Sequence, residues 1–180
     1  MKNLLEKSVK VTKMADSGQE IELRQDLISF KNLILILESE LGSYKLNEDA
    51  KNWRYSSVNI KMQFGYLDKT KKIPILEGNL SVNLYMICQR CLEVFEFPLN
   101  ISLKYAFFIR ENNFAKNIKY EIWELSNEKL NIYDFIEEIL IISIPLYPSH
   151  KSNENCNLLL NNVDGKNKNR PFSSLKDLIK

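Results

Sequence analysis

The chain has 180 residues, of which 44% are hydrophobic and 27% charged, a composition typical of a soluble globular protein with one domain. Its formal net charge of +2 excludes the strongly basic chain that counterion release alone would hold on nucleic acid, so any such contact must rest on local patches. The sequence contains no run of roughly 20 apolar residues that would span a membrane, and no signal peptide is expected at its start.

The first half of the chain predicts an edge strand and then a helix. Residues 4–12 are expected to form the strand. From Asp26, a good N-cap residue, apolar side chains recur every three or four positions, which predicts a helix over residues 26–41 that ends near Gly42. Residues 33–37 are apolar almost throughout and would also suit a buried strand, so both interpretations stay open.

Further along the chain, the apolar period changes to two. Alternating apolar and polar residues predict three strands with one buried face each, over residues 58–66, 80–88 and 95–107. Because these strands follow one another closely, they are expected to form an antiparallel meander. A shorter fourth strand is expected over residues 120–125.

A second helix is predicted over residues 131–144, with Asn131 as its N-cap. Glu137 and Glu138 are expected to lie on its solvated face. The helix becomes apolar all round before Pro145 stops it, so its last turn is expected to be buried.

The rest of the chain predicts a tether and a docking segment. Residues 151–169 are rich in Asn and Lys and predict a flexible linker, while residues 171–179 predict a short amphipathic helix that docks. The fold expected is therefore α+β, with a single domain over residues 1–150 built on an antiparallel meander and two flanking helices. Residues 151–180 would form the linker and the docking segment.

All the cysteines and the one histidine fall into two short clusters. Cys88 and Cys91 form a C-x2-C turn between two predicted strands, and His150 precedes Cys156 by six residues. Zinc prefers four tetrahedral ligands drawn from thiolate and imidazole, so this set predicts a Cys3His zinc site. In the alternative, the turn is a small strand end without metal, and His150 and Cys156 lie elsewhere in space. An odd number of cysteines without an export signal favours a reducing cytoplasm over a disulfide framework.

Enzymatic chemistry has little support in the sequence. The C-x2-C turn is flanked by strands, whereas thioredoxin-like redox chemistry needs a helix N-terminus after the first cysteine. With a single histidine, no Gly-x-Ser-x-Gly elbow and no glycine-rich phosphate loop, neither a hydrolase nor a nucleotide-binding enzyme is favoured. We therefore expect a protein without catalytic residues or a small-molecule substrate.

Basic side chains gather in two predicted loops. Lys69, Lys71 and Lys72 crowd one hairpin loop, and Arg90 stands between the two cysteines of the turn. A guanidinium with its fixed fork of donors suits a phosphate contact, so these four residues are the predicted RNA contacts. The alternative is that they are ordinary solvated charges.

Three blocks of the sequence together resemble the bacterial YceD family, named for large ribosomal RNA subunit accumulation. The first is the Cys-Gln-Arg-Cys turn with Phe95. The second is the acidic, then aliphatic helix that leads to Pro145, Pro148, His150 and Cys156. The third is Pro171-Phe172 with Leu175. The sequence departs from the family pattern at Arg170, where Asn is favoured, and at Ile139, where a further acidic residue is common.

The resemblance implies a cytoplasmic, non-enzymatic protein needed for normal synthesis, processing or stability of large-subunit ribosomal RNA. Its partner would be that RNA, its precursor or a ribosome assembly intermediate, with no membrane involved. A second hypothesis is a protein-binding adaptor that contacts a ribosomal protein or an RNA-processing enzyme without touching RNA. A third, hydrolysis at an open zinc site, is disfavoured because four protein ligands would close the site.

Overall fold

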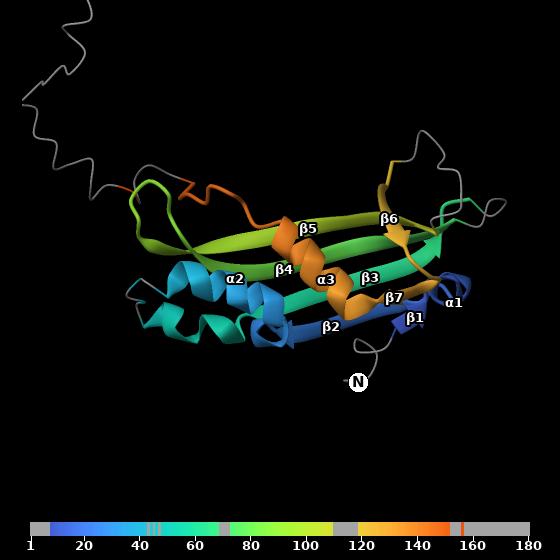
Figure 1. Cartoon of the computed structure of the whole chain (residues 1–180), viewed down its shortest axis with the longest axis horizontal. Helices are drawn as coiled ribbons and strands as arrows, with labels where there is room; N and C mark the ends of the chain where they lie inside the picture. The colour runs from blue at the N-terminus through green and yellow to red at the C-terminus, as the bar shows by residue number, and fades with distance from the viewer. Residues whose placement is uncertain are drawn as a thin grey trace, which may run out of the picture.

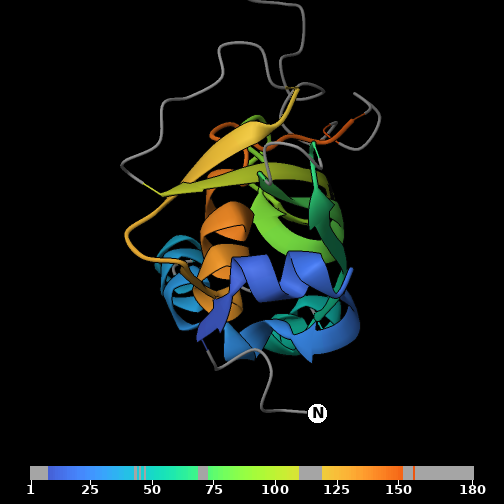
Figure 2. The ribbon, with the colours of Figure 1, turned by 90° about the vertical axis from the view of Figure 1, so that its right-hand side faces the viewer.

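The computed structural model describes residues 8–42, 44, 46, 48–68, 73–109, 119–151 and 156. In this part of the chain, helices α2 (Lys31–Leu41) and α3 (Ile132–Ile142) cover one face of a five-stranded sheet (Figure 1). The sheet curves around α3 (Figure 2). Its strand order is β2 (Glu20–Asp26), β3 (Ser57–Tyr66), β4 (Pro74–Ile87), β5 (Val94–Ile109) and β6 (Glu121–Leu125).

Shorter elements complete the described structure. Strands β1 (Ser8–Lys10) and β7 (Lys129–Asn131) pair antiparallel as a separate two-stranded sheet, and α1 (Val11–Asp16) follows β1 directly. Two 3₁₀ helices, Leu27–Ser29 and Asp49–Tyr55, flank α2 in sequence. No helix within the described ranges is long and apolar enough to cross a membrane.

The predicted meander is confirmed, and β2 extends it by one strand. Strands β2 to β5 are antiparallel neighbours in chain order. The expectation of a wholly antiparallel sheet is wrong at β6, because Tyr105 pairs with Glu121 in a parallel register. A parallel neighbour needs a crossover connection of about a dozen residues, and the stretch between β5 and β6 has about that length.

The N-terminal predictions need two corrections, and one open alternative is settled. Asp26 ends β2 opposite Ser57, its side chain makes no capping hydrogen bond to the 3₁₀ helix that follows, and α2 begins only at Lys31. The predicted edge strand is limited to β1, because Val11 already begins α1, while residues 1–7 lie outside the described part. Since residues 33–37 lie within α2, the alternative of a buried strand there is excluded.

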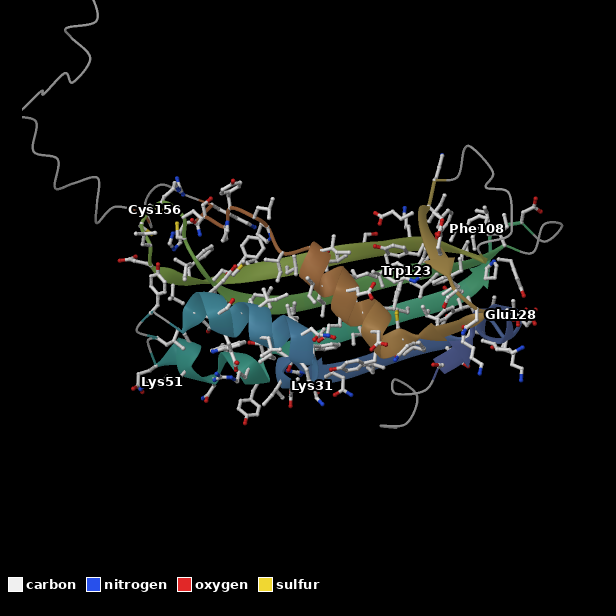
Figure 3. The ribbon with its side chains drawn as sticks, viewed as in Figure 1. Lys31, Lys51, Phe108, Trp123, Glu128 and Cys156 are labelled. Atoms are coloured by element: carbon white, nitrogen blue, oxygen red, sulfur yellow. The ribbon has the colours of Figure 1, made fainter. Side chains whose placement is uncertain are left out.

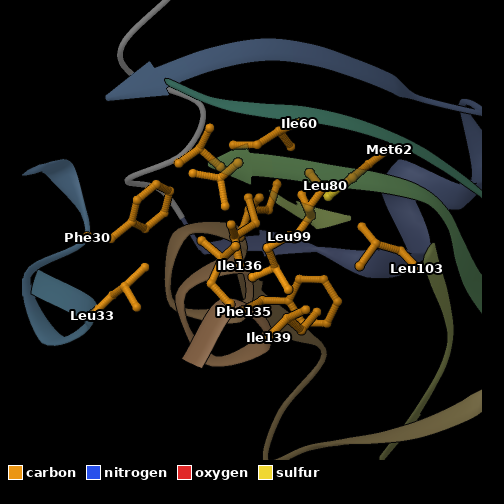
Figure 4. Close-up of a cluster of buried hydrophobic side chains, with 14 of the residues drawn as sticks. Phe30, Leu33, Ile60, Met62, Leu80, Leu99, Leu103, Phe135, Ile136 and Ile139 are labelled. Atoms are coloured by element: carbon orange, nitrogen blue, oxygen red, sulfur yellow. The ribbon is translucent and has the colours of Figure 1, made fainter. Parts of the chain in front are cut away.

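The core lies between the sheet and the two helices. Phe30 and Leu33 from the α2 region meet Phe135, Ile136 and Ile139 of α3 over the buried face of the strands (Figure 4). On that face β3, β4 and β5 each contribute alternate apolar side chains, as a period of two requires.

The central strands approach too closely for any side chain at Gly78. A Cβ atom built there would lie 2.1 Å from the backbone oxygen of Lys61 on β3. Gly78 has an ordinary extended conformation, so backbone strain does not explain this glycine. The close approach of β3 does, because it leaves no room for a side chain in the middle of β4.

Glu137 is buried, which corrects the prediction of a solvated acidic face. Only 4% of the residue is exposed, and its carboxylate accepts hydrogen bonds from the backbone and side-chain nitrogens of Asn32 at 2.7 and 2.8 Å, and from Leu33 N at 3.3 Å. Phe30, the N-cap residue of α2, makes no capping bond with its side chain. Glu137 therefore satisfies the free N–H groups at the start of α2 from the neighbouring helix.

The start of α3 is as predicted and its end is not. The side chain of Asn131 accepts from Tyr133 N at 3.1 Å, which confirms the cap. The helix ends at Ile142, two residues before the predicted end. Its last turn is buried on one side only, because Ile139 and Leu140 are buried while Ile142 is 75% exposed. Apart from Lys151 and Cys156, the predicted linker and docking segment lie outside the described residues.

Candidate metal centre

The cysteine turn closes the hairpin between β4 and β5. Cys88 N donates to Glu93 O at 2.9 Å, and Leu92 N donates to Cys88 O at 2.8 Å, so both cysteines lie on one tight loop. Leu92 has a φ of +59°, in the left-handed region that costs a residue with a side chain roughly 1–2 kcal/mol. The hydrogen bonds of the turn hold this strained conformation in place.

The loop after α3 is attached to this turn by contacts of its own. Gln89 N donates to Pro148 O at 2.9 Å, and the Arg90 guanidinium donates to His150 O at 2.5 Å. The His150 ring lies against Phe95 of β5, with 4.4 Å between the ring centres. Two segments about 60 residues apart in sequence are thereby held together.

The four predicted metal ligands come together at this junction. One ligand atom from each of Cys88, Cys91, His150 and Cys156 lies within 4.8 Å of all the others. Cys88 Sγ is 3.6 Å from Cys156 Sγ, and His150 Nδ1 is 3.6 Å from Cys91 Sγ and 3.2 Å from Cys156 Sγ. Figure 3 shows Cys156 at the end of the sheet where this hairpin lies. The alternative that His150 and Cys156 lie elsewhere in space is excluded.

Three of these separations are close to the edges of a tetrahedral zinc site. Zinc–sulfur bonds of about 2.3 Å and zinc–nitrogen bonds of about 2.0–2.1 Å place neighbouring sulfurs about 3.8 Å apart, and sulfur and nitrogen about 3.6 Å apart. The three separations given above lie within about 0.4 Å of those values. All three cysteines are buried, while His150 is partly exposed. The donor set is therefore compatible with Zn²⁺.

The environment favours a thiolate at Cys88. Burial of Cys88 raises its pKa, but the backbone N–H groups of Cys91, Arg90 and His150 donate to its sulfur and together bring the pKa down to about 5. The pKa of Cys156 is raised to about 11, first by burial and then by hydrogen bonds with Cys88 and Cys91. Since the thiolate is the form of cysteine that binds a metal, the lowered pKa of Cys88 is compatible with a cation at this centre.

Of the four predicted RNA contacts, only Arg90 lies within the described residues. Arg90 lies at the cysteine turn, where its guanidinium holds the His150 carbonyl. Lys69, Lys71 and Lys72 are outside the described residues, but the flanking residues Leu67 and Ile73 are bonded to each other at the opposite end of β4. The 14 residues of β4 separate the two ends by about 45 Å at the usual rise of a strand.

Two residues of the centre have roles that the sequence reasoning missed. Phe95 supports the imidazole of His150, and Pro148 accepts the bond from the turn through its carbonyl. Both residues stand in the blocks that carry the family resemblance, and the spacing Pro-x-His places a rigid residue close before the ligand.

Comparison with known proteins found one family. A family model described as large ribosomal RNA subunit accumulation protein YceD matches residues 76–179, more than half of the chain. This range includes all four residues of the candidate metal centre. No curated protein and no solved structure matches the chain.

Proposed function

The chain belongs to the YceD family of large ribosomal RNA subunit accumulation proteins, and from this we propose that it is a non-enzymatic ribosome biogenesis factor of the cytoplasm. It supports the synthesis, processing or stability of large-subunit ribosomal RNA, and it does so by binding this RNA or an assembly intermediate. The family match is the observation that carries the proposal.

We further propose that Cys88, Cys91, His150 and Cys156 hold one Zn²⁺. Support comes from the ligand separations and from the N–H groups that surround the Cys88 sulfur. Four protein ligands leave no open position for water or substrate, so the ion would stabilise structure and would not catalyse a reaction. It would lock the loop after α3 onto the hairpin and fix the position of Arg90.

The zinc proposal is tested by measuring metal in the full chain, purified without chelator. We expect about one equivalent of zinc in the unaltered protein and in Gln89→Ala, a control whose side chain is changed within the same turn. Cys88→Ser should lose the metal. Less than ~0.2 equivalents in the unaltered protein would refute the proposal.

RNA contact is proposed at the two ends of the sheet, through Arg90 at one end and Lys69, Lys71 and Lys72 at the other. The open face of the sheet is a poor surface for phosphate. Its exposed charged side chains are six acidic and three basic, namely Glu20, Glu22, Asp26, Glu77, Glu96 and Glu124 against Arg24, Lys61 and Lys104. Phosphate is therefore expected to meet the ends of the sheet and not its middle.

The same acidic face favours the second candidate function, an adaptor that binds a basic ribosomal protein or an RNA-processing enzyme. Crosslinking in cells separates the two candidates. An RNA-binding protein gives nucleotide adducts at peptides that contain Arg90 or Lys69, whereas an adaptor gives only protein adducts. In either case, depletion should lower the ratio of large to small ribosomal subunits, and an unchanged ratio would overturn the proposed function.

The role of Arg90 is tested by the salt dependence of RNA binding. Removing one phosphate contact to a single strand lowers the slope of log affinity against log salt by about 0.7. Arg90→Ala should show this decrease, while Arg90→Lys, which keeps the charge, should not. Zinc content is measured in both variants, because Arg90 also holds His150. An unchanged slope in a zinc-loaded Arg90→Ala protein would exclude the phosphate contact.

A further inference from the structure

The most exposed large apolar side chains of the described structure are close in sequence, at the last residue of α3 and in the loop that follows it. Ile142 is 75% exposed, Leu146 87% and Tyr147 81%, the three highest values among the large hydrophobic residues described. They belong to a run of seven residues, Ile141 to Tyr147, in which only Ser143 is polar. We call Ile142, Leu146 and Tyr147 the α3-end patch.

Such a patch is unusual on the surface of a monomer if nothing covers it. Its neighbours Ile141 and Ile144 pack against the core, so the segment is folded onto the domain with its other side facing outward. Single exposed apolar residues are common, but several adjacent ones mark a surface that something else covers.

A candidate cover is present later in the same chain. Apolar residues Phe172, Leu175, Leu178 and Ile179 recur at spacings of three, three and one, the pattern of a short amphipathic helix beginning after Pro171. The family match runs from residue 76 to residue 179, so it includes the α3-end patch and this segment up to its last apolar residue.

The tether that carries this segment starts beside the patch. Cys156 Sγ lies 3.2 Å from His150 Nδ1, and His150 is only three residues beyond Tyr147. Residues 157–170 span at most about 50 Å, with a root-mean-square length of about 20 Å for a flexible chain. Such a short tether gives an effective concentration in the millimolar range, which favours an intramolecular contact over a second copy.

Charge is also compatible with this contact. Glu138 is exposed one helical turn before Ile142. Within residues 171–179 Lys176 is balanced by Asp177, and Lys180 follows directly, so a lysine is available to pair with Glu138 at the edge of the patch.

We propose that residues 171–179 dock as an amphipathic helix on the α3-end patch of the same molecule. The docked segment covers the apolar surface next to the metal centre, and it fastens the C-terminal part of the chain to the end of α3. The proposal is independent of the RNA contact and of bound zinc.

Hydrogen exchange of the full chain, followed by mass spectrometry, tests the docking. A free helix of this length is marginal in water, so protection of amides in residues 172–179 reports docking. We expect at least ~10-fold protection in the unaltered protein. Leu146→Asp in the patch and Phe172→Asp in the segment should each abolish it. Leu35→Asp, at a site 63% exposed on α2, is the matched control and should leave it unchanged.

Three results would overturn the proposal. One is an unprotected segment in the unaltered protein, and a second is protection that survives Leu146→Asp. The third is protection that rises between ~1 and ~100 μM protein, since this dependence would assign the patch to a second copy of the chain. Circular dichroism of each variant verifies that the domain is folded.

Discussion

Removal of the Glu137 carboxylate should weaken the contact between the two helices, whereas removal of the adjacent Glu138 carboxylate should not. Glu137 receives two short hydrogen bonds from Asn32 and a longer one from Leu33, all at the first turn of α2. Glu138 is exposed on the same helix. The two residues therefore form a matched pair for the same substitution.

The expected loss follows from these three bonds. Hydrogen bonds to a charged group contribute about 1.5–3 kcal/mol each, and part of this is offset by the cost of burying the carboxylate. We expect Glu137→Ala to lower the free energy of unfolding by about 2–4 kcal/mol, including the loss of a negative charge at the start of α2. Glu137→Gln keeps one acceptor oxygen and should lose about half as much. Glu138→Ala should stay within about 0.5 kcal/mol.

Urea unfolding at saturating zinc, monitored by the fluorescence of Trp53 and Trp123, measures these differences. The melting temperature of Glu137→Ala should fall by roughly 4–16 °C. If Glu137→Ala and Glu138→Ala unfold at the same urea concentration, the carboxylate does not support α2 and the reasoning is refuted.

Three further predictions concern the sheet and the metal centre. Gly78→Ala should destabilise the fold by about 3 kcal/mol or more in the same urea assay, because the added Cβ would overlap the Lys61 backbone. Gly65→Ala should be neutral or stabilising, because no atom lies within 4 Å of a Cβ built at that position. Leu92→Gly should stabilise the chain by about 0.5 kcal/mol by relieving the positive φ, and a matching gain in Leu92→Ala would contradict this. Cys156→Ser should weaken zinc binding by more than the ~10–100-fold that is typical when a residue outside the ligand set is substituted. Competition with a chromophoric chelator measures the affinity, and an unchanged value would exclude Cys156 as a ligand.

Local sequence patterns were sufficient for several elements. The alternation along β3, β4 and β5 has a period of two, and a one-residue shift would expose every buried side chain, so these strands follow from the sequence. Asn131 indicates the start of α3 because its side chain caps the residues directly after it. Strand β2 carried the same kind of signal in Ile21 and Leu23, which alternate with charged residues, but the helical spacing after Asp26 obscured it.

Other features depend on residues far apart in the chain. Asp26 has the chemistry of an N-cap, yet its pairing with Ser57 keeps it in a strand, and α2 is capped instead by Glu137, 105 residues away from Asn32. The direction of β6 depends on the crossover from β5, and no short-range pattern encodes that.

The metal centre also has one aspect that the sequence determines, the type of its ligands, and one that only the tertiary structure determines, their convergence. Ligand type is a property of individual residues, so the sequence alone indicates Cys88, Cys91, His150 and Cys156 as a candidate metal-ligand set. Their convergence required the β4–β5 hairpin and the end of α3 to meet, through the Pro148 carbonyl, the Arg90 guanidinium and the Phe95 ring. Local periodicity and side-chain chemistry act over a few residues, whereas closing a site across about 60 residues depends on how the sheet and α3 pack.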